Sequence, residues 1–190
     1  VFPDALIEEC KKCRDEVQAE TWSTARKTIE NELGPLNDIF KSVDPIPIAA
    51  ASIAQVHSAI LHDDSSVVVK VKRPKIQDQV ISDLKVLAWL APKFVGRIPV
   101  AALTNPPALV ELFAETICEE LDFNLEVANL FELERALRAN PKNSWEFPIP
   151  NLDYVTSRII VMSAVEGVSL GNANEMHLEV EEISDVFRQM

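Results

Sequence analysis

The sequence predicts an α+β domain in which a small antiparallel sheet is flanked by helices. The first observation is a strongly β-branched run, Val67–Val71, which follows turn-like residues at 62–66 and indicates a β-hairpin. The second is that apolar residues recur at helical spacing on both sides of this hairpin. The third is that prolines separate the helical stretches from extended ones, at positions 45, 47, 74, 141, 148 and 150.

The part before the hairpin is predicted to be mainly helical. Residues 4–20 are rich in Glu, Lys and Ala and should form a first helix. Thr21 and Ser23 are alternative caps for a second helix, which should end at Leu33 because Gly34 is a favourable C-terminal residue. The segment 43–47 is expected to be extended, since its two prolines exclude a helix.

The hairpin should pair a first strand containing Ile53, Val56 and Ile60 with a second strand that ends before Pro74. Two longer helices are predicted after it, at about 76–95 and 107–137. After the prolines that follow, a buried strand is expected at 158–163 and closes at Gly167. A polar helix is predicted from there to Met190.

Composition narrows the class of function. The 190 residues carry a formal net charge of −12, which argues against nucleic acid or an anionic membrane surface as the main partner. Cys10 and Cys13 are more simply two thiols on a helix than a redox or zinc site, and no metal ligand set is assigned. The first residues lack the features of a secretory signal, and no apolar run reaches transmembrane length.

Lys70 lies in the middle of the β-branched run, between Val69 and Val71. Because side chains alternate along a strand, it faces away from both valines. Taken alone, it is more simply a lysine on a solvated sheet face. The alternative is a lysine that holds nucleotide phosphates and is oriented by a glutamate on a neighbouring helix.

An acidic stretch occurs within the predicted helix at 107–137. On a straight helix, Glu120 and Glu126 are six residues apart and point in different directions. They would serve one partner only if the helix were broken between them. An acidic stripe of this kind is usually a solvated helix face.

Three segments together resemble the UbiB (ADCK-type) family of atypical protein-kinase-like proteins. They are the alanine-rich segment 47–57, the segment Val69–Pro74, and Glu120–Phe123 with Glu126 and Asn129. They occur in the family's order and spacing, and the resemblance extends over residues 3–170. It implies a kinase-like small lobe at 43–170, preceded by a helical extension at 1–42 and followed by the start of a helical segment at 171–190.

The resemblance also implies roles for particular residues. The alanine-rich loop, Ala49, Ala50, Ala51 and Ser52, stands in for the glycine-rich loop of kinases, and Lys70 matches the nucleotide-positioning lysine. Glu120 and Asp122 match the family's Glu-x-Asp motif. Glu126 is the preferred partner of Lys70, with Glu120 as the reserve. The backbone near Met162 and Ala164 matches the hinge that binds the adenine edge.

The resemblance implies binding of ATP or ADP in support of isoprenoid-quinone metabolism such as ubiquinone (coenzyme Q) biosynthesis. Quinone-pathway proteins or lipids are the partners it suggests. It implies an intracellular location, in a mitochondrion, a plastid or bacterial cytoplasm, or at a membrane, and does not decide among them. The sequence contains no His-x-Asp loop with a downstream Asn and no Asp-Phe-Gly, so Mg²⁺ is expected only with a large lobe that is absent here.

Two alternatives stay open from the sequence. A truncated relative could be a non-catalytic interaction module, which the acidic composition and the absent large lobe favour. Conventional protein kinase activity is the weaker alternative, because the alanine-rich loop should cover phosphates differently from a glycine-rich one. The chain is therefore expected to bind nucleotide but to be incomplete as an enzyme.

Overall fold

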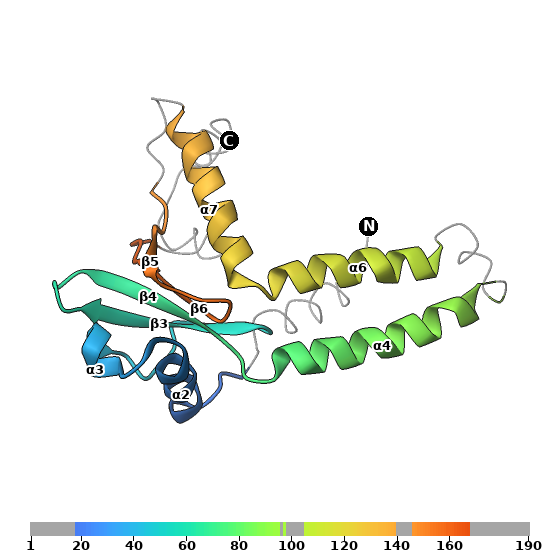
Figure 1. The fold of residues 1–190 in the computed structure, drawn as a ribbon, viewed down its shortest axis with the longest axis horizontal. Helices are drawn as coiled ribbons and strands as arrows, with labels where there is room; N and C mark the ends of the chain where they lie inside the picture. Colours follow the sequence, from blue (N-terminus) through green and yellow to red (C-terminus); the bar gives the residue numbers. More distant parts are fainter. Residues whose placement is uncertain (1–17, 96, 98–104, 140–145, 168–190) are drawn as a thin grey trace, which may run out of the picture.

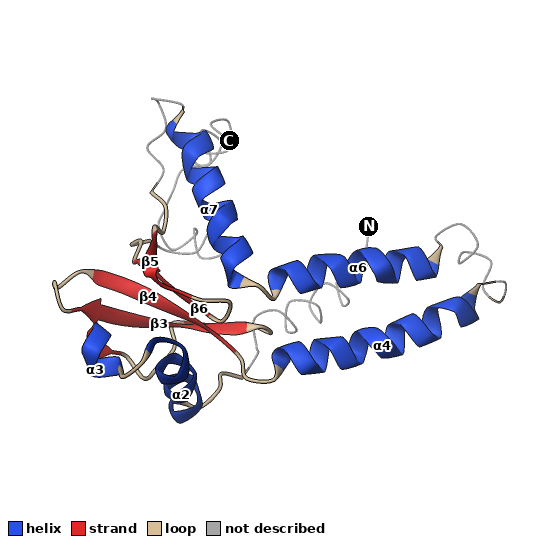
Figure 2. Cartoon of the chain, in the orientation of Figure 1, coloured by secondary structure: helices blue, strands red, loops and turns tan. Residues whose placement is uncertain are grey.

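A six-stranded antiparallel sheet forms the centre of the computed structural model, which describes residues 18–95, 97, 105–139 and 146–167. The strand order is β1-β3-β4-β6-β5, and β2 pairs with the start of β3. The strands are β1 (Phe40–Val43), β2 (Ala49–Ala50), β3 (Ala54–Leu61), β4 (Ser66–Lys72), β5 (Pro150–Val155) and β6 (Ile159–Ser163). The helices are α2 (Trp22–Leu33), α3 (Leu36–Ile39), α4 (Ile76–Phe94), α6 (Pro106–Glu120) and α7 (Phe123–Arg138), as Figures 1 and 2 show.

The predicted hairpin is confirmed as β3 and β4, which pair in antiparallel register. Asp64 takes a left-handed conformation with φ 67° at the turn, which Asp readily adopts, and Asp63 accepts a hydrogen bond from the Ser65 amide at 3.0 Å. On its other edge β4 pairs with β6, where Lys70 lies opposite Ile160. The strand predicted at 158–163 is therefore the neighbour of the lysine-bearing strand.

The two faces of the sheet have separate cores. On one face Val69, Val71 and Ile159 are buried together with Ile29 of α2 and Phe40. The opposite face is covered by α7, which buries Phe123 and Val127 against the sheet residues Ala54, Ile160 and Met162. Because side chains along β4 point alternately to the two faces of the sheet, Lys70 lies on the face toward α7. The interpretation of Lys70 as a lysine on a solvated face is therefore wrong.

The helix α2 begins and ends as the sequence predicts. Gly34 has φ 94°, a value that glycine adopts without strain, and its amide donates to the carbonyl of Glu30 at 3.1 Å. Residues 18–20 are not helical, so the first predicted helix does not reach Glu20. The rest of that helix, like the one predicted after Gly167, lies outside the described residues.

The single helix predicted at 107–137 is wrong, because the chain breaks at Leu121 and Asp122 into α6 and α7. Asp122 has an extended backbone, φ −107° and ψ 105°, and its side chain accepts a hydrogen bond from the Asn124 amide. An aspartate in this position satisfies a free amide of a new helix, so it starts α7 rather than continuing α6. The two helices diverge in direction at this point (Figure 2).

The helix predicted at 76–95 is confirmed as α4, which lies beside α6 and projects with it away from the sheet (Figure 1). Within the described ranges, no helix has both the length and the apolar character needed to cross a membrane. The sequence reasoning missed β1, β2, β5 and α3. The expected boundary at residues 42 and 43 falls inside β1, and the division into three parts stays a prediction.

Candidate functional site

A cavity of about 840 Å³ lies between the alanine-rich loop, β4 and the helices α6 and α7. Its volume is in the range of small-molecule and cofactor sites. Its apolar wall is built from Ile53, Ala54, Phe123, Leu125, Leu130 and Leu133, and its polar groups are Ser52, Lys70, Thr116, Glu119, Glu120, Glu126 and Asn129. Residues far apart in the sequence therefore meet around one hollow.

Lys70 and Glu126 form the ion pair of this cavity. The Lys70 Nζ lies 2.6 Å from both carboxylate oxygens of Glu126, and both side chains are partly exposed. Glu126 stands in the first turn of α7, where the helix dipole favours a negative charge. Of the two glutamates that the sequence offered as partners of Lys70, the structure brings Glu126 into contact.

The break between α6 and α7 places Glu120 on the same cavity as Glu126. Along a straight helix the two side chains would diverge, but here each belongs to a different helix. Asp122 caps α7 instead of lining the cavity, because its Oδ1 accepts from the backbone amide of Asn124 at 3.0 Å and from its side-chain amide at 2.9 Å. The Glu-x-Asp motif therefore combines a cavity carboxylate with a helix cap.

Phe123 forms the floor beneath the ion pair. Its ring is 1% exposed, and the Nζ atoms of Lys70 and Lys72 lie 4.8 and 4.9 Å from the ring centroid. Both ammonium groups are attracted to the ring face, and the ring limits their movement. The first residue of α7 thus holds two lysines of β4 in place.

Lys72 is a buried lysine that the sequence reasoning missed. It is 3% exposed, and its Nζ donates to the carbonyls of Leu121 and Ser157. Burial lowers the pKa of Lys72, and the opposing effect of the nearby Asp122 carboxylate, which raises this pKa, is smaller. By binding the carbonyl of Leu121, Lys72 connects β4 to the break between α6 and α7. The available signal was its spacing of two from Lys70, which places both on one strand face.

The alanine-rich loop contributes only part of its length to the cavity. Ala49 and Ala50 form β2 and pair with Val56 and Gln55. Ala51 and Ser52 line the cavity. The amide of Ala51 donates to the carbonyl of Ala54 at 2.8 Å, which closes the loop into a tight turn.

The two hinge positions expected to contact adenine do not line this cavity. Met162 is 9% exposed and belongs to the core beneath α7. The amide of Ala164 donates to the carbonyl of Ser66 at 3.1 Å, and Ala164 lines a separate cavity of about 370 Å³ with Arg138 and Ile149. The structure brings Lys70, Glu120 and Glu126 together with Ala51 and Ser52, and leaves Met162 and Ala164 apart from them.

Comparison with protein families gives a match over most of the chain. Residues 12–190 match the model of the ABC1 atypical kinase-like domain. The chain is 32% identical over 173 residues to the chloroplastic aarF domain-containing protein kinase At5g05200 of Arabidopsis thaliana, covering 90% of this chain and 32% of that protein. It is also 32% identical over 181 residues to the Vibrio cholerae protein named "Probable protein kinase UbiB", covering 93% of this chain and 32% of that one.

A solved structure shares the fold. The structure of Rv3197 in complex with erythromycin, from Mycobacterium tuberculosis, matches with a TM-score of 0.68 and 24% identity over 95% of this chain and 45% of that one. Together with the family match over residues 12–190, this shared fold identifies the antiparallel sheet and its helices as a kinase-like small lobe. The chain spans about a third of the length of the curated relatives it matches. These relatives occur in a chloroplast and in bacteria.

Proposed function

The chain belongs to the ABC1 atypical kinase-like family, and we propose that the cavity beside Lys70 binds the phosphates of ATP or ADP. The single observation that carries the proposal is the ion pair between Lys70 and Glu126. In kinase-like folds a strand lysine held by a helix glutamate is the group that binds nucleotide phosphates. This pair lines an apolar hollow together with Ala51 and Ser52 of the alanine-rich loop.

The residues of the cavity fit such a ligand. Ile53, Phe123 and Leu130 supply an apolar wall that suits a nucleobase. Lys70 supplies a cation, and the Ser52 hydroxyl is available as a donor in the loop above. Met162 and Ala164 do not line this cavity. We therefore place the nucleobase against the apolar wall rather than at the hinge backbone.

Charge predicts a requirement for a divalent cation. Three glutamates line the cavity, Glu119, Glu120 and Glu126, against one lysine, Lys70. A polyphosphate brings further negative charge, and like charges close together repel strongly in a partly buried site. The metal ligands that kinases use lie in loops that these 190 residues lack, so we expect Mg²⁺ here only as a counterion carried by the nucleotide, whose phosphates it neutralises.

The names of the relatives support a proposal for the cellular role. The name UbiB is carried by several bacterial proteins that the chain resembles at 31–32% identity. On this basis we propose that the protein acts as a UbiB-like atypical kinase or ATPase that supports isoprenoid-quinone metabolism. Quinone-pathway proteins or lipids would then be its partners. For the 190 residues themselves, the proposal is nucleotide binding rather than turnover, since the sequence lacks the catalytic and metal-binding loops of kinases.

Thermal unfolding of the 190-residue chain with ADP or ATP, with and without Mg²⁺, tests the proposal. A ligand at about 100 times its Kd should stabilise the folded chain by about 2.7 kcal/mol. Lys70→Ala should reduce the affinity about tenfold or more, because it removes the charge-assisted contact. Lys41→Ala is the matched control, since Lys41 is an exposed lysine of β1 paired with Asp64. Equal stabilisation of the wild type and Lys70→Ala, or none in the wild type, would disprove nucleotide binding at Lys70.

A second candidate function is a non-catalytic interaction module. The observation that favours it is the arm of α4 and α6, where Trp89 is 66% and Leu112 60% exposed. Large apolar side chains are thus exposed on two adjacent helices, and exposed apolar patches are typical of interaction sites. The same thermal unfolding experiment distinguishes the two functions, because a pure interaction module shows no nucleotide-dependent stabilisation.

A further inference from the structure

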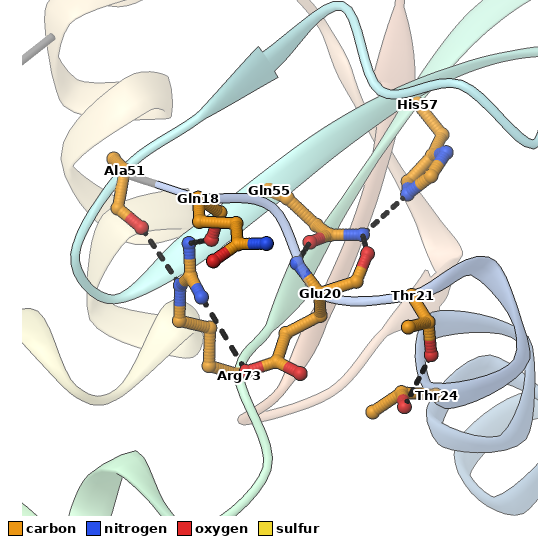
Figure 3. Close-up of polar contacts among 8 residues, drawn as sticks. All are labelled: Gln18, Glu20, Thr21, Thr24, Ala51, Gln55, His57 and Arg73. Carbon is orange, nitrogen blue, oxygen red and sulfur yellow. Dashed lines mark hydrogen bonds and ion pairs between the residues drawn. The ribbon is translucent and has the colours of Figure 1, made fainter. Parts of the chain in front are cut away.

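Arg73 connects two segments that the sequence separates by about thirty residues, the alanine-rich loop and the segment before α2. Its Nε donates to the carbonyl of Ala51 at 2.8 Å. One terminal nitrogen donates to the carbonyl of Gln18 at 2.7 Å, and the other lies 3.4 Å from the Glu20 carboxylate. Figure 3 shows the guanidinium between these three groups.

The segment before α2 is held at a second point. The amide of Glu20 donates to the side-chain oxygen of Gln55 at 2.8 Å. The side-chain nitrogen of Gln55 in turn contacts the backbone carbonyl of Glu20 at 3.5 Å. That nitrogen also lies 2.8 Å from the Nε2 of His57, whose other ring nitrogen contacts the carbonyl of Asp44. Gln55 is 2% exposed and His57 is fully buried, so this support is fixed by the sheet (Figure 3).

The loop end of the contact lies beside the candidate site. Ala51 lines the cavity together with Lys70, and its carbonyl is the one that Arg73 holds. The backbone amide of Arg73 also donates to the carbonyl of Ile53 at 2.9 Å. The residues on both sides of Ser52 are therefore anchored to Arg73, one by its side chain and the other by its backbone.

We propose that Arg73 is a positioning residue for the alanine-rich loop, and that the segment Gln18–Glu20 controls the loop through it. The planar guanidinium can hold a carbonyl of each segment and a carboxylate at once, which a lysine ammonium on a flexible stem does not reproduce. Displacement of Gln18–Glu20 removes two of the three partners of Arg73, and the loop over the phosphates loses its support. This regulation rests on the proposed nucleotide site.

Hydrogen exchange of the nucleotide-free chain tests the connection directly. In Arg73→Lys we expect the Ala51 amide, which donates to Ala54, to exchange about tenfold faster. Glu20→Gln removes only the ion pair and should produce a smaller acceleration at the same amide. Arg26→Lys is the matched control, because Arg26 is an exposed arginine of α2 that pairs with Glu30 of the same helix.

Two results would overturn the proposal at this stage. One is an unchanged Ala51 amide in Arg73→Lys. The other is an equal acceleration throughout β4 and β6, which would make Arg73 a general support of the sheet. Either result is obtained without nucleotide and so does not depend on whether the chain binds one.

Ligand affinity distinguishes loop positioning from stability. We expect Arg73→Lys to weaken the binding of ADP with Mg²⁺ on the order of fivefold or more, and to leave adenosine binding unchanged, since the loop covers phosphates. Equal weakening of both ligands, or of neither, contradicts the proposal. If the wild type binds no nucleotide, the proposed function fails, and the exchange measurement still decides whether Arg73 couples the two segments.

Discussion

The sheet with its covering helices and the arm of α4 and α6 are packed very differently. The strands and α2 bury large side chains completely, among them Ile29, Ile159 and Val161. In the arm, α4 buries only Ala91 among its described residues, and α6 buries none. Elements with few buried apolar contacts open at a lower free energy than packed cores. The sheet is therefore the stable part of the molecule, and the arm the easily displaced part.

The candidate site lies where these two regions meet. Lys70 comes from the sheet, whereas Thr116, Glu119 and Glu120 come from α6. One wall of the cavity is thus the well-packed sheet, which carries the Lys70 ammonium group. The opposite wall is the weakly packed α6, which carries the carboxylates of Glu119 and Glu120. We therefore expect the Lys70 side of the site to resist perturbation, and the α6 side to respond to whatever the arm contacts.

The largest effect is expected from shortening a core side chain of the sheet. Ile159 of β6 is fully buried in the core that also contains Ile29 of α2. Ile159→Ala should lower the free energy of unfolding by about 2–5 kcal/mol, because it removes buried apolar volume and leaves a cavity. Urea denaturation measures the change, and Ile159→Val, with an expected loss of about 0.5–1.5 kcal/mol, is the graded control. A loss below that of the valine variant would contradict the idea of a tightly packed sheet.

An intermediate effect on stability is expected from replacing Lys72, which connects the sheet to the end of α6. Lys72→Met leaves the carbonyls of Leu121 and Ser157 without this donor. The Leu121 carbonyl is buried, and leaving it without this donor costs about 1–3 kcal/mol, partly offset because a buried charge is also removed. The Ser157 carbonyl belongs to an exposed residue and still accepts from the Phe123 amide at 3.5 Å. We expect a net loss of roughly 1–3 kcal/mol at neutral pH, measured by urea denaturation.

The pH dependence of this difference provides a second measurement. Burial lowers the pKa of Lys72 below its ordinary 10.5, so the unfolded chain binds more protons than the folded one between the two pKa values. The stability of the wild type relative to Lys72→Met should therefore rise as the pH increases through that window toward 10.5. A relative stability that falls with pH would show that Lys72 is not destabilised by burial.

The sequence was sufficient for the parts of the fold that local chemistry determines. Proline, glycine and β-branched residues located α2, α4, the hairpin and β6, since each acts on its own backbone. The break at Leu121–Asp122 was not predicted, because helical spacing continues across it and the partners that stabilise it, such as Lys72, come from a distant strand. In the same way Arg73 gave no local signal, because its partners at Gln18 and Glu20 are close only in space.

The smallest effect is expected in the arm, and it tests the difference in packing most directly. Leu112 of α6 is 60% exposed, so Leu112→Ala should change the free energy of unfolding by no more than about 0.5 kcal/mol. Its contrast with Ile159→Ala comes mainly from burial, since both changes shorten a branched aliphatic side chain. If Leu112→Ala instead costs more than about 2 kcal/mol, the side chain must be buried in solution by something bound to the arm. Repeating the measurement over a range of protein concentrations would then identify a second copy of the chain as that partner, because only self-association makes stability depend on concentration.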